Sequence, residues 1–222
     1  MGAVLAPALA IFLAHHAAGA RGRDILLLLD ASALMPIADA MHAEHAVYMI
    51  ARNFTRAGDV ISLHVGRDGG VFDTPADESV IGASCAALRA AGGAAPSLYE
   101  FVVRAIDTFS LHREQQQIAA RDPVVFLISN GQFLESLDSE TKALLQTLHE
   151  RWGCETSVMI TTRGDPTQRA SMFLVAAAGG GKVYVTKKGH GPYEVVDVEM
   201  GRGGLTVRGH RVVAPSWLPN VL

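Results

Sequence analysis

The chain has 222 residues, of which 49% are hydrophobic and only 18% are charged. A chain of this length and apolar content buries enough surface to fold without a disulfide or metal, and its composition excludes an intrinsically disordered protein. The net charge is −3, from 19 basic and 22 acidic residues, so no general basic field attracts nucleic acid. Two cysteines, Cys85 and Cys154, are too few for a disulfide framework or a four-cysteine zinc module.

Residues 1–20 form an apolar stretch without a charged side chain. Three interpretations fit this stretch: a leader buried against the domain, a secretory signal peptide, or a membrane anchor. The small residues 18–20 resemble a signal-peptide cleavage site, but the basic start of a signal peptide is missing. His15 and His16 near the end of the stretch disfavour a membrane span. We predict a retained leader over residues 1–23 and leave secretion open.

Apolar strand-like runs and helical periodicity alternate along the chain after residue 24. Strands are predicted over residues 25–29, 60–65, 71–72, 124–128, 157–160 and 183–185. Helices are predicted over residues 37–54, 79–91, 98–109, 139–152 and 167–178. We expect Ser139 to cap the helix that it begins. The alternation predicts an α/β fold with a doubly wound, mainly parallel sheet and helices on both faces, in one domain over residues 24–190.

Residues 191–222 have the pattern of a β-hairpin that extends this domain. Two runs of strand-forming residues, 193–200 and 205–213, flank a glycine-rich turn. We predict that this hairpin contributes an interface, because its outer strand offers an edge and tryptophan is favoured at interface centres. The candidate contact residues are Tyr193, Arg208, Arg211 and Trp217. The alternative is that the basic residues form a solvated face that protects the edge strand.

Polar residues follow two of the predicted strands, at the sheet edge where ligands bind in open parallel sheets. The landmarks along the chain are, in order, Ile25 to Leu29 followed by Asp30-Ala31-Ser32, Gly58-Asp59 before a strand, Gly92-Gly93 leading to Ser97-Leu98-Tyr99-Glu100, Ser129-Asn130-Gly131 after a strand, and Ala176-Ala177-Ala178-Gly179-Gly180 before Lys182 to Val185. In this order and spacing they resemble the von Willebrand factor A (vWA) domains over residues 24–186. The resemblance implies a vWA-type, Rossmann-like sheet.

The same resemblance implies a metal site, which vWA domains often build from an Asp-x-Ser-x-Ser loop, a threonine and a second aspartate. The matching positions in this chain are Asp30, Ser32, Ser97 and Asn130. Leu34 replaces the second serine, Pro96 stands where the threonine would align, and Asn130 replaces the second aspartate. Mg²⁺ needs oxygen ligands and charge neutralisation, so a single carboxylate predicts a degenerate metal-ion-dependent adhesion site. We expect no cofactor, with Mg²⁺ bound weakly or not at all, and expect Asp30 to accept hydrogen bonds from the turn after its strand.

The vWA resemblance implies a function in binding proteins. We predict a non-enzymatic scaffold that is a subunit of a hetero-oligomeric complex, with protein partners and no direct contact with nucleic acid or membrane. Residues 96–99 and the Gly-Gly stretch before residue 182 resemble the vWA subunit of general transcription factor IIH. That narrower resemblance implies a DNA-repair role and an intracellular, nuclear location. The zinc modules of that subunit have no counterpart, because two cysteines cannot form them.

A second class of function stays open, because residues 29–34 also resemble the opening of a PIN-type ribonuclease. Such enzymes gather acidic residues around Mg²⁺ or Mn²⁺ to activate a water molecule. The candidate acids are Asp30, Glu44, Asp107 and Asp122. A strand directly after the first helix fits the vWA order better, so the nuclease is the alternative.

Two other features receive structural interpretations. Gly179-Gly180-Gly181-Lys182 has the composition of a phosphate loop, but here it follows a helix and precedes a strand, the reverse of a P-loop. We therefore assign it no nucleotide site. Cys85 lies in the apolar phase of its predicted helix and is expected in the core.

Overall fold

The computed structural model describes residues 22–30, 37–51, 55, 59–65, 72–74, 82, 86, 97–114, 121–131, 137–160, 166–186, 193–201 and 204–213. Its strands are β1 (Arg23–Leu29), β2 (Val60–Val65), β3 (Phe72–Thr74), β4 (Asp122–Ser129), β5 (Glu155–Ile160), β6 (Gly180–Thr186), β7 (Tyr193–Gly201) and β8 (Gly204–Val213). Its longer helices are α2 (Ile37–Met49), α4 (Leu98–Glu114), α5 (Ser139–Trp152) and α6 (Pro166–Ala178). The predicted alternation of strands and helices is confirmed.

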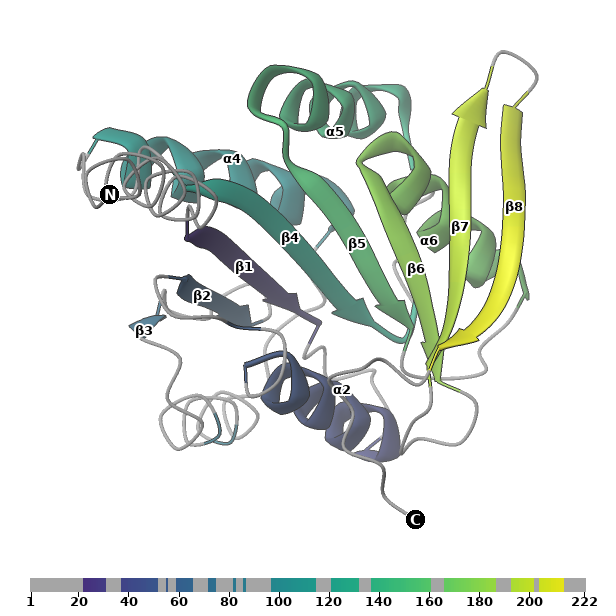
Figure 1. The fold of residues 1–222 in the computed structure, drawn as a ribbon, viewed down its shortest axis with the longest axis horizontal. Coiled ribbons are helices and arrows are strands. Elements are labelled where there is room, and N and C mark those ends of the chain that lie inside the picture. Colours follow the sequence, from purple (N-terminus) through teal and green to yellow (C-terminus); the bar gives the residue numbers. More distant parts are fainter. Residues whose placement is uncertain are drawn as a thin grey trace, which may run out of the picture.

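The strands form one eight-stranded sheet in the order β3-β2-β1-β4-β5-β6-β7-β8 (Figure 1). Five strands in the middle of this order, β2, β1, β4, β5 and β6, are parallel to one another. Antiparallel strands flank them, with β3 at one edge and the β7–β8 hairpin at the other. The prediction of a mainly parallel, doubly wound sheet is confirmed, and so is the hairpin.

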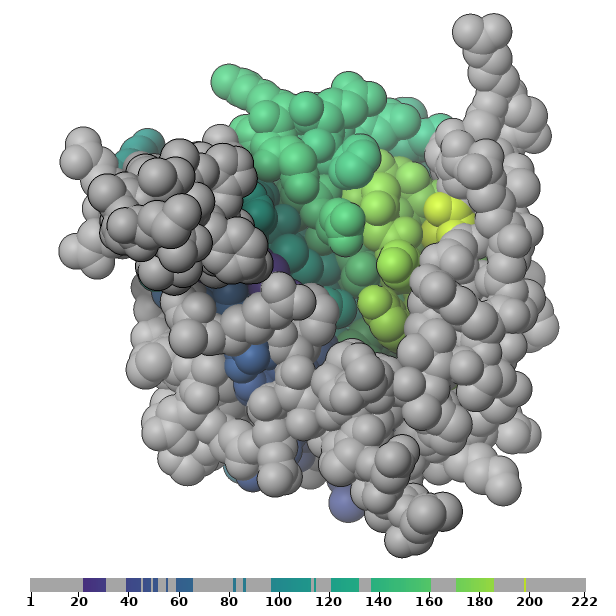
Figure 2. Space-filling model, in the orientation of Figure 1, coloured from purple at the N-terminus to yellow at the C-terminus, as the bar shows by residue number. Residues whose placement is uncertain are grey.

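Helices cover both faces of this sheet because β1 is apolar on both of its sides. Leu26 and Leu28 belong to a core shared with α4, α5 and α6 on one face. Ile25 and Leu27 belong to a second core, shared with α2 on the other face. In the space-filling view of Figure 2, the described surface is green over α5 and becomes yellow-green over the strands beneath that helix.

The helix bounds match the prediction for α5 and differ for the other three longer helices. α2 ends at Met49, before the predicted residue 54, α4 continues past residue 109 to Glu114, and α6 begins at Pro166, one residue early. The N-cap of α5 is Asp138, and not Ser139 as we expected: the Asp138 carboxylate accepts a 2.6 Å hydrogen bond from the Thr141 N–H. An aspartate one residue earlier is an equally good cap and carries a charge that favours the helix N-terminus. For the predicted helix over 79–91, the described residues are Gly82 and Ala86, and both are helical.

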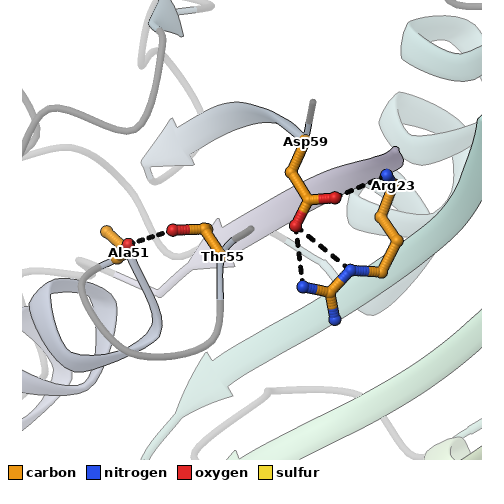
Figure 3. A network of polar contacts seen from close by, with 4 residues as sticks. All are labelled: Arg23, Ala51, Thr55 and Asp59. Carbon is orange, nitrogen blue, oxygen red and sulfur yellow. Dashed lines mark hydrogen bonds and ion pairs between the residues drawn. The ribbon is translucent and has the colours of Figure 1, made fainter. Parts of the chain in front are cut away.

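The start of β1 is fixed to the residue before β2 by a two-part contact with Asp59 (Figure 3). The Arg23 backbone N–H donates to Asp59 Oδ1 at 2.7 Å, and its guanidinium donates to Oδ2 at 2.7 and 3.2 Å. The Asp59 side chain is only 2% exposed, so this pair holds the register of β1 against β2.

The glycines at the start of β6 are required by close packing against the end of α5 and the start of β5. A Cβ on Gly181 would lie 2.1 Å from the Thr156 carbonyl oxygen, and one on Gly180 would lie 2.2 Å from the His149 ring. Gly180 also has a positive φ of 64°. These contacts give the glycine run a structural role.

Residues 1–21 of the predicted leader, which we placed over residues 1–23, lie outside the described residues, as do Ser32, Cys85 and Trp217. Among the helices that the structure describes, none is both long and apolar enough to cross a bilayer.

Candidate functional site

Two of the predicted site residues meet at the carboxyl ends of neighbouring strands. β1 and β4 are parallel, with Leu29 opposite Ile128, so Asp30 and Asn130 follow the two strands at the same edge of the sheet. The Asp30 N–H donates a 2.9 Å hydrogen bond to the Ile128 carbonyl, which continues the ladder past the end of β1. The exposed fractions of Asp30 and Asn130 are 2% and 1%.

A short relay of hydrogen bonds links the two strand ends. The Gly131 N–H donates to Ser129 Oγ at 2.9 Å, and that hydroxyl donates to Asp30 Oδ2 at 2.8 Å. Gly131 has a φ of 84°, so the chain turns sharply enough for its N–H to reach back two residues. Sequence reasoning expected Asp30 to accept from the turn after its own strand, and that turn lies outside the described residues. The structure adds a donor from β4.

Ser97, the third predicted ligand, caps α4. Its hydroxyl accepts from the Glu100 N–H at 3.1 Å, and its own N–H donates to Glu100 Oε2 at 3.0 Å. This reciprocal pair is a capping box, which satisfies two N–H groups at the helix start. The next residue, Leu98, lines the same small apolar gap as Leu28 of β1, so α4 begins over the carboxyl half of that strand.

The described residues at this edge do not fit a dedicated Mg²⁺ site. Mg²⁺ binds octahedrally to oxygen ligands and usually needs more than one negative charge. Here Asp30 is the single carboxylate among the matching positions, and one of its oxygens already accepts from Ser129. Asn130 supplies a neutral amide, and the Ser97 hydroxyl serves the helix cap. Within the described part of the chain, no cluster of three or more His, Cys, Asp or Glu residues is placed to hold a metal.

Three of the four predicted interface residues lie on the outermost part of the sheet, and Trp217 lies outside the described residues. Tyr193 begins β7 opposite Val213, and Arg211 of β8 lies opposite Val195. Arg208 lies at a register shift, because Gly209 pairs with Asp197 while Val207 pairs with Val198. Figure 1 shows the hairpin as the last element of the sheet on that side.

The four acids of the ribonuclease alternative do not come together. Asp122 opens β4 opposite Arg23, at the opposite end of the sheet from Asp30. Asp107 is exposed on α4, and Glu44 lies on α2, which covers the other face. A nuclease site with one or two metal ions needs its carboxylates within a few ångströms of each other.

Sequence reasoning missed two buried polar pairs that connect α4 to the sheet. His112 Nδ1 lies 2.8 Å from Asp24 Oδ2, and both side chains are at most 5% exposed. Thr108 Oγ1 lies 3.2 Å from His64 Nε2, also in the interior. A signal was available: residues 108 and 112 continue the apolar phase of α4 set by Phe101 and Ala105, and a polar residue in that phase must find a buried partner.

Cys154 is a buried cysteine whose thiol is close enough to Asp24 to be affected by its charge. Burial, together with the negative charge of Asp24, raises the pKa of the Cys154 thiol from 9.0 to about 12. Because the thiolate is the reactive form, a thiol that keeps its proton is inert.

No protein-family model matches the sequence, and neither does any curated protein. Among solved structures, the fold is similar to an aerotolerance-related membrane protein from Bacteroides fragilis carrying multiple mutations to serine. The TM-score is 0.54 and the identity 13%, over 76% of this chain and 93% of that one. A von Willebrand factor type A protein from Catenulispora acidiphila gives the same TM-score and identity, over 77% of this chain and 40% of that one.

A manganese-loaded TRAP protein from Plasmodium vivax is also similar, at 13% identity and a TM-score of 0.48, over 70% of this chain and 63% of that one. Likeness at this identity concerns the fold. The likeness to the Catenulispora acidiphila protein, at a TM-score of 0.54, shows a vWA-type α/β fold, as the sequence landmarks predicted. The degenerate character of its strand-end site and the likeness to transcription factor IIH stay predictions.

Proposed function

We propose that the chain is a protein-interaction domain that catalyses no reaction and binds its partner without a metal ion. The observation that carries this proposal is the state of Asp30. Its carboxylate is 2% exposed and accepts a hydrogen bond from Ser129, so it serves the junction of β1 and β4. In this vWA-type fold the strand-end carboxylate is engaged in a hydrogen bond within the protein. The loops and the edge strands are then the surfaces that remain for a partner.

We further propose that the partner is another subunit of a stable complex. Tyr99, next to the α4 cap, is 37% exposed, and Leu111 on the same helix is 49% exposed. A partner bound along α4 would remove both of these apolar side chains from water. That burial supports a subunit role. The narrower likeness to the vWA subunit of transcription factor IIH and an intracellular location belong to this proposal on the sequence resemblance alone.

That narrower likeness is supported mainly by Tyr99. The neighbouring Ser97 is explained by the capping box, and the glycines at the start of β6 are explained by packing on Thr156 and His149. The specific assignment therefore depends on whether Tyr99 contacts a partner.

The test is affinity purification of the tagged full chain from its native source, followed by gel filtration and mass spectrometry. The proposal expects a protein recovered in stoichiometric amount, eluting with the chain. Tyr99→Ser should weaken recovery, while Lys142→Ser, a change on α5, should not. A chain that elutes alone overturns the proposal, and so does RNA cleavage with Mn²⁺ that is lost in Asp30→Asn.

A further inference from the structure

The outermost strand of the sheet, β8, differs in charge from the strand that it pairs with. β7 carries three acids, Glu194, Asp197 and Glu199, and no base. β8 carries Arg208, His210 and Arg211 and no acid. The sheet therefore ends in an acidic strand followed by a basic one.

The pairing between the two strands does not match these charges residue by residue. Arg211 lies opposite Val195, and His210 lies opposite Val196. Asp197 in turn lies opposite Gly209. The basic residues of β8 thus have no acid directly across from them in β7.

In the part of the chain that the structure describes, no strand pairs with the outer edge of β8. An edge strand has a row of backbone N–H and C=O groups along its outer side, and a second extended chain can hydrogen-bond to them. β8 has ten residues, and its register with β7 is uninterrupted from Gly209 to Val213. That length is sufficient for an added strand of ordinary size.

We propose that β8 accepts an acidic, extended segment of a partner protein as a ninth strand. Opposite charges across neighbouring strands stabilise their pairing, whereas like charges destabilise it. His210 and Arg211 occupy consecutive positions of the strand, on opposite faces of the sheet, so acidic residues on either face of the added strand would lie next to a basic position of β8, which favours the pairing. A second copy of β8 would place arginine near arginine, so the same charges disfavour edge-to-edge pairing of two chains. This inference names the partner class for the interaction domain proposed above and rests on that function.

The experiment uses synthetic ten-residue peptides with the unchanged full chain. One peptide alternates valine and glutamate, a second alternates valine and lysine, and a third is the acidic peptide with methylated backbone nitrogens. Binding is measured by fluorescence anisotropy, and hydrogen exchange locates the amides that become protected. We expect the acidic peptide alone to bind and to slow exchange in β8. Loss of binding by the methylated peptide separates strand pairing from simple charge attraction.

A matched pair of variants then tests how much the basic charge of β8 contributes to binding of the acidic peptide. Arg211→Glu should weaken binding of the acidic peptide by roughly tenfold, whereas Arg151→Glu on the exposed side of α5 should leave it unchanged. Equal binding of both charged peptides, no binding of either, protection away from β8, or dimers that form through β8 would each overturn the inference. A natural partner that binds the parent chain and Arg211→Glu equally well overturns this inference alone. If no partner is recovered at all, it is the proposed function that fails.

Discussion

Ser129 Oγ donates a 2.8 Å hydrogen bond to Oδ2 of Asp30, which lies 99 positions earlier in the chain. This contact joins the carboxyl ends of β1 and β4 at the edge where open parallel sheets bind ligands. The hydroxyl also accepts from the Gly131 N–H, so its donor and one of its lone pairs are both used. The relay makes Asp30 a structural residue of the sheet edge.

Asp30→Ala is expected to lower the free energy of unfolding by about 1–3 kcal/mol, because it leaves the buried Ser129 hydroxyl without its acceptor. Urea denaturation of the single variants, and of Asp30→Ala combined with Ser129→Ala, measures the coupling. The double variant should cost less than the sum of the two single variants. Strict additivity would mean that the two side chains do not depend on each other.

Removal of one member of the buried Asp24–His112 pair should be more costly. His112→Ala is expected to lower the free energy of unfolding by about 3 kcal/mol, since Asp24 is left buried without this partner. Glu114→Ala, an exposed change two residues along the same helix, is the control and should stay within about 0.5 kcal/mol of the parent. Equal stability of the two variants would contradict a supporting role for the pair.

The regular part of the fold could be predicted because it depends on local patterns. Apolar runs such as Ile25 to Leu29 identify strands that are buried on both faces, and the phase of Phe101 and Ala105 identifies the inner side of α4. Helix ends are set by single side chains. The cap of α5 is therefore Asp138 where we expected Ser139, although the apolar patterns that identify strands and helices are the same with either cap.

The contacts at the site could not be predicted in the same way. The bond from Ser129 to Asp30 depends on the register of two strands that are separated by most of the domain. The pairing of His112 with Asp24 likewise depends on how α4 lies across the sheet. Sequence indicates which residues are polar and in phase with the core, but their partners are fixed only by tertiary packing.

Gly180 and Gly153 offer a comparison that separates steric clash from backbone strain. Both have positive φ, of 64° and 66°, but a Cβ on Gly153 meets nothing within 4 Å. Gly153→Ala should cost about 1–2 kcal/mol for the left-handed conformation alone. Gly180→Ala should cost about 1–3 kcal/mol more, because its Cβ would meet the His149 ring. Thermal unfolding of both variants measures the difference, and equal losses would contradict the close packing of this turn.

The raised pKa of Cys154 predicts a loss of stability at alkaline pH. The thiol ionises at its ordinary pKa of 9.0 in the unfolded chain but keeps its proton to about 12 in the folded protein. The folded state therefore binds the proton more tightly, and the contribution to stability is complete below pH 9.0 and falls as the pH rises toward 12. Urea unfolding across this range should show a steeper decline for the parent chain than for Cys154→Ala. Parallel declines would show that the thiol is not buried as described.

Metal-independent binding is tested most directly by titrating the recovered partner against the chain in a chelator and in millimolar Mg²⁺, with Asn130→Asp beside the parent. Asn130 lacks the charge that a second carboxylate would contribute, and charge is the larger part of the attraction for a divalent cation. We predict the same dissociation constant for the parent chain in both buffers, and Mg²⁺ affinity that is measurable only in Asn130→Asp. Loss of partner binding by the parent chain in chelator would contradict the account and would make the strand-end residues a working metal site.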